Sequence, residues 1–271
     1  MTELITDRIS IRPARIADAV EIANVTRSGI DPQLVGATIY GCEGIEHYIR
    51  YQIAARGSGA DTVYTVACEE ERIVGCVELR LKPGEIFLNY ISVLPEMRSQ
   101  GLGTRLLLAA IKNAGWNGRE IKLDVFDENL QAKRWYERLG FRHSTSLIWQ
   151  RIRPERATCA SEAIVSDYPQ ACVCHERFGF GAFSVFTPSG AYRVGILGRD
   201  WFRITEESAL SDVFLMSTLC MLDSNRDILA IVPEISAMQE DTHETSVIAR
   251  SHRLYSNLCT LLNKLSHLVG I

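Results

Sequence analysis

Residues 93–107 read Val93-Leu94-Pro95-Glu96-Met97-Arg98-Ser99-Gln100-Gly101-Leu102-Gly103-Thr104-Arg105-Leu106-Leu107. The apolar run from Ile86 to Val93 predicts a β-strand, and the aliphatic residues from Leu102 to Ile111 predict a helix. A strand that enters a helix through R-x-x-G-x-G leaves several backbone N–H groups free at the helix N-terminus. These donors and the helix dipole favour an anion such as a pyrophosphate. The stretch therefore predicts a phosphate-binding loop.

The spacing of the glycines excludes two other phosphate loops. A Walker loop needs Gly-Lys followed by Ser or Thr, and no lysine lies between Gly101 and Leu106. A dinucleotide-binding turn needs a third glycine at the position that Leu106 occupies. Gly101 and Gly103 allow the backbone to approach phosphates without a Cβ, and Arg98 adds a fixed positive charge.

A second motif follows the loop. Ile121 to Val125 alternates like a strand, and Asn129 to Phe141 then reads NLQAKRWYERLGF. Asn129 can cap the start of a helix, and Gly140 can end it. Together, R-x-x-G-x-G and N-x-x-A-x-x-x-Y-E-x-x-G-F resemble the two signatures of the GNAT superfamily of N-acetyltransferases. The resemblance covers the N-terminal half of the chain, and no family is recognised in the C-terminal half.

The resemblance implies an α/β (α+β) fold, in which a GNAT-type mixed sheet carries flanking helices. A second α/β domain follows, which could be a degenerate GNAT-like unit. The polar stretch from Arg151 to Arg156 contains Pro154, which has no N–H for a continuing strand or helix. We therefore expect a GNAT domain over residues 1–153 and a C-terminal α+β domain over residues 157–271. The second domain could bind the acceptor, form a dimer or repeat the GNAT fold.

Hydrophobic periodicity predicts the elements of both halves. In the first half, we expect helices at residues 17–28 and 44–55 and strands at 62–67, 73–81 and 86–93. In the second half, we expect strands at 171–174, 182–186, 191–197, 202–205 and 228–232, and helices at 206–222 and 246–268. The apolar stripe of the last helix is expected to pack within its own domain.

The resemblance also implies the cofactor and its site. Acetyl-CoA would place its phosphates on the amides from Arg98 to Thr104 and its pantetheine along the strand from Tyr90 to Val93. Asn129 and Tyr136 match family positions that face the cofactor. The predicted cofactor-binding residues are Ile91, Ser92, Val93, Arg98, Ser99, Gln100, Gly101, Leu102, Gly103, Thr104, Asn129 and Tyr136.

The implied reaction is direct acyl transfer to an amine in a ternary complex. A backbone N–H near Ile91 would hold the developing oxyanion, and Tyr136 would serve the leaving thiolate. Some family members carry a strand glutamate as general base, but Phe87 stands at the matching position. Glu78 and Glu85 are neighbouring candidates, of which Glu78 is preferred, and a water chain ending on backbone carbonyls is the alternative.

Two other functions stay open. The domain could bind or sense an acyl-CoA without catalysis, or it could use a longer acyl donor. The acceptor, a small-molecule amine, an amino acid derivative or a protein amine, is expected to contact the region from Asp31 to Tyr51, where Tyr40, Glu43, Glu46 and His47 are polar candidates.

Composition narrows the partners and the compartment. The 271 residues carry a net charge of −4 with a pI near 5.9, which argues against nucleic-acid binding through a basic surface. No apolar run is long enough to span a membrane, and the N-terminus does not resemble a secretory signal. The eight scattered cysteines are expected to be free thiols of a cytoplasmic protein, and the protein could form a homodimer. Cys172-Val173-Cys174-His175 lacks a second ligand pair, so no metal site is expected.

Overall fold

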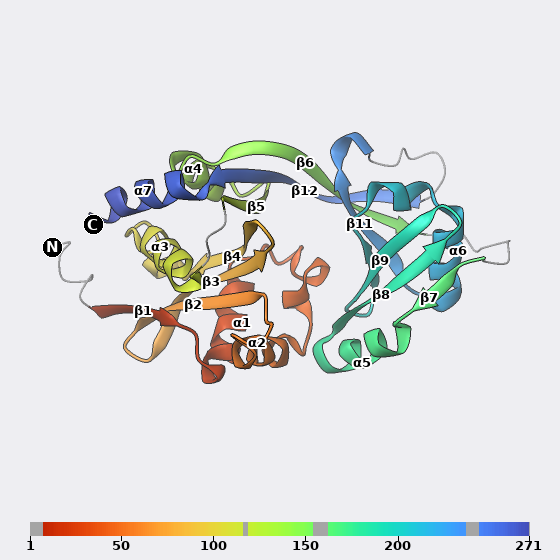
Figure 1. Ribbon diagram of the computed structural model, residues 1–271, viewed down its shortest axis with the longest axis horizontal. Coiled ribbons are helices and arrows are strands. Elements are labelled where there is room, and N and C mark those ends of the chain that lie inside the picture. The colour runs from red at the N-terminus through yellow and green to blue at the C-terminus, as the bar shows by residue number, and fades with distance from the viewer. Residues whose placement is uncertain (1–7, 116–118, 154–161, 237–243, 271) are drawn as a thin grey trace. The chain divides into compact units, whose positions relative to one another are not determined.

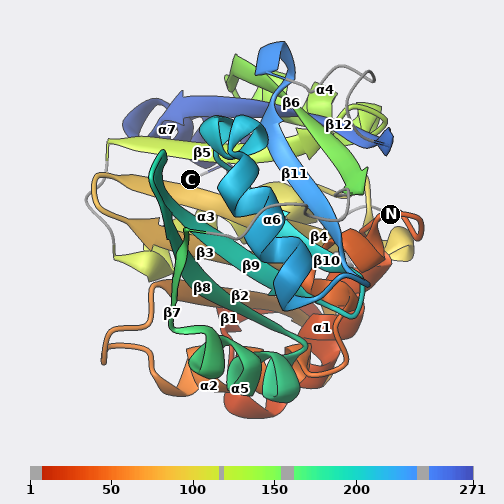
Figure 2. The same ribbon diagram turned by 90° about the vertical axis from the view of Figure 1, so that its right-hand side faces the viewer.

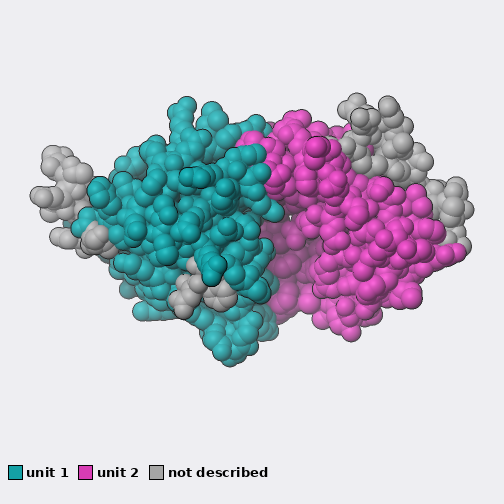
Figure 3. Space-filling model, turned by 45° about the horizontal axis from the view of Figure 1, so that its top comes forward, with its two compact units in different colours: residues 1–31, 46–144, 253–271 teal, residues 32–45, 145–252 magenta. Residues whose placement is uncertain are grey.

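The computed structural model describes residues 8–115, 119–153, 162–236 and 244–270 (Figure 1). The chain divides into two compact units that are not continuous in sequence, as the colours of Figure 3 show. Unit 1 contains residues 1–31, 46–144 and 253–271, and unit 2 contains residues 32–45 and 145–252. The expected boundary near Pro154 lies outside the described residues, and the division into residues 1–153 and 157–271 stays a prediction.

Unit 1 is built around a mixed sheet with the strand order β1-β2-β3-β4-β5. Neighbouring strands from β1 to β4 are antiparallel, whereas β5 is parallel to β4. The strands are β1 (Ile9–Pro13), β2 (Thr62–Glu69), β3 (Arg72–Lys82), β4 (Glu85–Val93) and β5 (Glu120–Phe126). The helices are α1 (Ala19–Ser28), α2 (Ile45–Ala54), α3 (Leu102–Ala114), α4 (Leu130–Arg138) and α7 (Leu258–Val269).

The core of unit 1 includes the C-terminal helix of the chain. Leu106 and Leu107 of α3 are fully buried in one cluster with the apolar residues of β3, β4 and β5. Leu258, Leu261 and Leu265 of α7 belong to the same cluster. The expectation that the last helix packs within the C-terminal domain is therefore wrong. Its apolar stripe completes the core of the unit that carries the N-terminal strands.

Unit 2 repeats the same order of elements. Its strands lie in the order β6-β11-β10-β9-β8-β7, and β10 and β11 are the parallel pair. The helix α6 connects that pair and packs on the sheet through Leu215 and Leu219 (Figure 2). The elements are β6 (Arg142–Arg153), β7 (Ile164–Ser166), α5 (Tyr168–Phe178), β8 (Phe180–Thr187), β9 (Gly190–Leu197), β10 (Trp201–Ile204), α6 (Val213–Leu222), β11 (Asp227–Pro233) and β12 (Glu244–Asn257). The part of β6 before residue 145 and the part of β12 after residue 252 belong to unit 1. The crossover β10-α6-β11 is thus the counterpart of β4-α3-β5 in unit 1.

One predicted strand is a helix. Residues 171–174 lie in α5, which starts with Pro169 in its first turn and ends at Gly179 in the left-handed conformation. A proline in the first turn and a glycine after the last turn favour a helix, and here they outweigh the β preference of Val173. In a helix, Cys172 and Cys174 do not lie on the same face.

The predicted helix at residues 246–268 is half strand. β12 continues to Asn257, and α7 begins only at Leu258. The side chain of Asn257 accepts a hydrogen bond from the backbone N–H of Thr260 at 3.2 Å and so caps the helix. Within β12, the buried Ala249 and Ser251 alternate with the exposed Arg250, as on a strand.

A shorter correction concerns residues 206–222. The segment begins with a 3-10 turn over Glu207–Ser211, and the α-helix starts after Asp212. The side chain of Asp212 accepts hydrogen bonds from two backbone N–H groups of α6, which fixes the start of the helix there.

Candidate active site

The strands β4 and β5 separate part way along their length. Their parallel pairing runs from Glu85 opposite Glu120 to Leu88 opposite Leu123. Asn89 is an extra residue in the β3–β4 ladder, since Glu78 is paired with Tyr90 and Leu79 with Leu88. Such a bulge bends the strand and increases its twist. The remainder of β4 therefore turns an unpaired backbone edge toward the gap.

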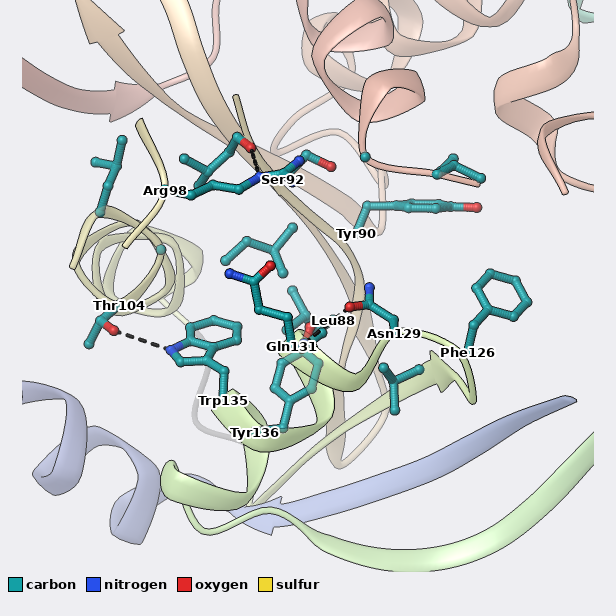
Figure 4. Close-up of a pocket in the computed structure, with 18 of the residues that line it drawn as sticks. Leu88, Tyr90, Ser92, Arg98, Thr104, Phe126, Asn129, Gln131, Trp135 and Tyr136 are labelled. Atoms are coloured by element: carbon teal, nitrogen blue, oxygen red, sulfur yellow. Dashed lines mark hydrogen bonds between the residues drawn. The ribbon is translucent and has the colours of Figure 1, made fainter. Parts of the chain in front are cut away.

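A cavity of about 480 Å³ occupies this gap, and all the residues that line it belong to unit 1. Figure 4 shows Tyr90 and Ser92 on the β4 side and Asn129, Gln131 and Trp135 on the α4 side. Every predicted cofactor-binding residue except Gln100 lines the cavity. Gln100 instead donates a hydrogen bond from its side chain to the carbonyl oxygen of Glu96 at 3.1 Å.

The glycine loop enters the cavity with open backbone donors. Ser99 and Gly101 have φ angles of 63° and 76°, which turn successive N–H groups to one side. Among the described residues, no backbone carbonyl accepts from the amides of residues 99–103, and no side chain caps α3. A Cβ on Gly101 would meet no other atom within 4 Å. The arrangement fits an anion such as a pyrophosphate.

Two side-chain hydrogen bonds hold the walls of the cavity. The Arg98 Nε donates to the carbonyl oxygen of Val93 at 2.8 Å, which ties the loop to the end of β4. The Trp135 Nε1 donates to the Thr104 Oγ1 at 3.3 Å and joins α4 to α3 (Figure 4). The cavity is therefore built between elements that are fixed to one another.

Tyr136 is buried in the wall of the cavity, with 6% of its surface exposed. Its ring meets the edge of Phe141 with 5.4 Å between centroids. Burial raises the pKa of Tyr136 above its ordinary value, so the phenol keeps its proton and is available as a hydrogen-bond donor.

Glu78 does not line the cavity. Its carboxylate is buried, and it accepts hydrogen bonds from the Asn89 Nδ2 at 2.6 Å and the Arg80 Nε at 3.3 Å. Burial disfavours the charge of Arg80, but Glu78 and neighbouring tyrosines together outweigh this effect and raise the pKa of Arg80. Asn89 lines the cavity, so Glu78 stands one side chain behind its wall.

The alternative Glu85 is engaged elsewhere. Its carboxylate accepts a hydrogen bond from the Lys122 Nζ at 2.6 Å, and this bond lowers the pKa of Glu85. Phe87 packs under a cation, with the Lys82 Nζ 4.8 Å from the ring centroid. Neither Glu85 nor Phe87 lines the cavity.

The polar candidates for acceptor contacts lie outside the cavity. Tyr40 is fully buried, and His47 stands 3.8 Å from the Glu46 carboxylate. Tyr40, Glu43, Glu46 and His47 are all absent from the cavity wall, where Gly29 and Ile30 are found instead. The segment from Pro32 to Ile45 belongs to unit 2.

Sequence reasoning missed several residues of the wall. Tyr90, Asp124, Phe126 and Trp135 line the cavity. The alternation of β5 places Asp124 and Phe126 on one face, and this pattern could have suggested that they act together. The partner of Asp124 is Arg253 of β12, which lies 129 residues further along the chain and carries no signal in the sequence.

None of the described helices is long and apolar enough to cross a membrane. The described cysteines are all free thiols. Burial raises the pKa of Cys76 to about 12, which keeps that thiol protonated and unreactive.

Comparison with known proteins shows what part of this chain resembles. The sequence model described as "Acetyltransferase (GNAT) family" matches residues 37–141. A protein of Bacillus subtilis (strain 168), named "Uncharacterized N-acetyltransferase YhfO", is 26% identical over 147 residues, which are 52% of this chain and 94% of that protein.

Two solved structures match nearly the whole chain. A GCN5-related N-acetyltransferase from Sphaerobacter thermophilus has a TM-score of 0.60 at 13% identity, and the match covers 93% of this chain and 96% of that one. A tandem GNAT protein from the clavulanic acid biosynthesis pathway has a TM-score of 0.61 at 12% identity, covering 92% and 98%. At these identities the likeness concerns the fold, and it includes the GNAT-like unit 2. The comparisons therefore show a GNAT acetyltransferase domain, of the acetyl-CoA-dependent type, at residues 37–141.

Proposed function

We propose that the protein transfers an acetyl group from acetyl-CoA to a primary amine by direct attack in a ternary complex. One observation carries the proposal: a single cavity joins the free amides of the α3 N-terminus to the unpaired edge of β4. A coenzyme with a pyrophosphate at one end and an amide-containing arm needs both features.

The loop and the strand would divide the cofactor between them. The amides from Arg98 to Thr104 would hold the pyrophosphate, and residues 91–93 of β4 would pair with the pantetheine like an added strand. When bound, the cofactor supplies the thioester, whose carbonyl carbon an amine attacks. We assign stabilisation of the developing oxyanion to a backbone N–H of β4 near Ile91.

Tyr136 would act as a hydrogen-bond donor to the leaving sulfur. A free thiol has a pKa of about 8.5, well below that of a buried phenol. Full proton transfer from Tyr136 to the thiolate is therefore unfavourable, whereas a hydrogen bond to the sulfur leaves the proton on the phenol. The proton that the thiol finally carries would be the one that the nitrogen loses after it has bonded to the carbonyl carbon.

We propose Glu78 as the acceptor of the proton that the ammonium form of the acceptor loses before the attack. An alkylammonium has a pKa of about 10 and must lose a proton before it can attack. Because Glu78 lies behind Asn89, the proton would have to travel through water beside that side chain. A water chain that ends on backbone carbonyls is the alternative, and Glu78→Gln separates the two. If Glu78→Gln abolishes the fall in kcat at low pH, the result supports Glu78 as the proton acceptor. If kcat falls at low pH as in the wild type, the result supports the water chain.

The first experiment measures cofactor binding. Isothermal titration with acetyl-CoA should show binding by the wild type and none by the double variant Gly101→Glu, Gly103→Glu. A matched control is Gly57→Glu, Gly59→Glu, which alters another G-x-G sequence where no atom lies within 4 Å of either added Cβ. Unchanged binding by the loop variant would refute the assignment of the site.

The second experiment tests turnover. Release of free thiol from acetyl-CoA in the presence of a panel of primary amines should be steady and should depend on the amine. Binding without release from any panel member would favour the alternative function, an acyl-CoA sensor. Faster release from hexanoyl-CoA than from acetyl-CoA would favour a longer acyl donor. We further propose that the enzyme acts in the cytoplasm, and a homodimer stays a prediction.

A further inference from the structure

Asp124 lines the cavity and forms a bidentate ion pair with Arg253, which does not itself line it. The Arg253 Nε donates to the Asp124 Oδ1 at 2.9 Å, and the Arg253 Nη2 donates to the Asp124 Oδ2 at 2.9 Å. Asp124 directly follows Leu123, the last residue of β5 that pairs with β4. The pair therefore stands where the two strands separate.

In this pair, Arg253 balances the negative charge that Asp124 brings to the cavity wall. Among the described residues that line the cavity, Asp124 is the only carboxylate. Arg253 itself is held against the ring of Phe87, with the guanidinium carbon 5.8 Å from the centroid. The pKa of Arg253 is raised, chiefly by its hydrogen bonds to Asp124. Asp124 is thus a fixed negative charge that one guanidinium neutralises.

The other charged groups near Arg253 do not replace it as the partner of Asp124. Glu85 of β4 acts on Arg253 but bonds to Lys122 of β5 at 2.6 Å. Glu120 stands 3.6 Å from the same lysine. Arg138 of α4 lines the cavity without contributing a negative charge. Removal of Arg253 would therefore leave Asp124 without its counter-charge.

Stability alone does not account for this pair. The side chains are 39% and 25% exposed, and a pair that open to water contributes little to folding. A charge in the cavity wall has a larger effect on the reaction. In the proposed transfer, the amine nitrogen bonds to the carbonyl carbon, the C–S bond breaks, and the sulfur takes the proton that the amine loses. An unbalanced carboxylate would favour the ammonium form of the amine and oppose both the oxyanion and the thiolate.

We propose that Arg253 is a positioning residue of the active site: by neutralising Asp124, it sets the ionisation of the groups that react where β4 and β5 separate. This inference rests on the proposed function, because it needs the thiol end of the cofactor in that place. The C-terminal part of the chain thus supplies a residue of unit 1 that contacts Asp124 in the cavity wall without lining the cavity itself.

Coenzyme A itself is the probe. The thiol of bound coenzyme A can be titrated by the ultraviolet absorbance of its thiolate, without any acceptor. Arg253→Met should raise the pKa of the bound thiol by roughly one unit, because Asp124 is then unbalanced. Asp124→Asn should lower it by roughly one unit, because Arg253 is then unbalanced. The double variant and the conservative Arg253→Lys should both titrate like the wild type.

Opposite shifts in the two single variants separate a charge effect from a structural one. Shifts in the same direction, or none, would overturn the inference. If Arg253→Met does not fold, the thiol pKa in Asp124→Asn is compared with that in Arg253→Lys. An unchanged thiol pKa in Asp124→Asn would then overturn the inference. Failure of the wild type to bind coenzyme A would instead refute the proposed function. With an amine that supports turnover, the acidic limb of kcat should shift in the same directions as the thiol pKa.

Discussion

The two crossovers β4-α3-β5 and β10-α6-β11 have the same topology but opposite helix starts. α3 begins after Gly101, which has φ 76° and no side chain to cap the helix. α6 begins after Asp212, whose carboxylate accepts from the N–H groups of Phe214 at 2.9 Å and Leu215 at 3.0 Å. Of these two crossover helices, only the one without a carboxylate cap can receive a phosphate at its N-terminus.

The environment of Asp212 keeps its carboxylate ionised, which opposes phosphate binding at the N-terminus of α6. The side chain is 3% exposed, and Thr187 donates to it at 2.6 Å. Although burial disfavours the ionised form, the hydrogen bonds from Thr187 and the helix amides outweigh it and keep the pKa of Asp212 below its ordinary value. The start of α6 in unit 2 thus carries the Asp212 carboxylate, whereas the start of α3 in unit 1 has free backbone N–H groups.

The units differ also in what completes them. Unit 1 draws α7 from the C-terminal end of the chain and Arg253 from β12, whereas unit 2 takes the segment from Pro32 to Ile45 out of the N-terminal half. The Cys42 Sγ donates to the carbonyl oxygen of Gly179 at 3.1 Å and fixes that segment within unit 2. The two units are therefore not separable by a single cut.

The largest expected effect tests this exchange of segments. Truncation after Arg156 removes α7, and burial of each of its core leucines contributes about 1.5–3 kcal/mol. The sum rivals the whole stability of about 5–15 kcal/mol that domains possess. The truncated chain should show no cooperative thermal transition by circular dichroism, whereas removal of only Gly270 and Ile271 should leave the transition intact. A truncated protein that melts cooperatively and binds acetyl-CoA would contradict the assignment of α7.

The next effect concerns chemistry in unit 1 alone. Tyr136→Phe should lower kcat about 100-fold, the lower end of what one hydrogen-bond donor to a developing negative charge contributes, with the Kd for acetyl-CoA nearly unchanged. The control is Tyr168→Phe in unit 2, where a tyrosine has a similar edge contact, with Phe183 at 5.0 Å. Equal kcat values for both variants would remove Tyr136 from the mechanism.

A smaller effect is expected in unit 2. Asp212→Ala should lower the free energy of unfolding by about 1–2 kcal/mol, because α6 loses its cap. That corresponds to a fall in Tm of about 2–8 °C. Binding of acetyl-CoA should not change, since the cofactor site belongs to unit 1. Weaker cofactor binding in this variant would show that the two helix starts are not independent.

The smallest effect is the pH dependence of the same cap. Because the folded pKa of Asp212 lies below its unfolded value, its contribution to stability is complete above the ordinary aspartate pKa of 3.8. The contribution is lost as the pH falls through the lower, folded pKa. The difference in unfolding free energy between wild type and Asp212→Asn should therefore shrink below pH 3.8 and stay constant between pH 5 and 7. A constant difference down to pH 2 would contradict the assigned ionisation.

Most of unit 1 could be predicted from the sequence, because its elements carry strong local signals. The glycine loop, the Asn129 cap and the alternation of β5 each determine local structure by themselves. In unit 2, the sequence predicts β10, β11 and the end of α6, but not α5, β12 or the start of α6. The apolar run around Val173 suits a strand or a helix, and helical spacing of the leucines in α7 extended by chance into β12.

What the sequence could not provide is long-range pairing. The bulge at Asn89, which places Glu78 behind the cavity wall, depends on the register between β3 and β4. The bond between Asp124 and Arg253 depends on the return of the chain to unit 1. Neither the bulge nor the ion pair has a local sequence pattern, because both result from the pairing of strands that are not set by neighbouring residues.

The comparison of the two helix starts can be tested by giving α3 the cap of α6. Gly101→Asp and Gly101→Asn introduce side chains of nearly equal size, and both residues tolerate a positive φ better than most. The two variants therefore differ in charge and hardly in strain. If open amides at this helix start bind the pyrophosphate, the Kd for acetyl-CoA should be at least about tenfold higher for Gly101→Asp than for Gly101→Asn, and high salt should narrow the gap. Equal Kd values for the two variants would contradict the account.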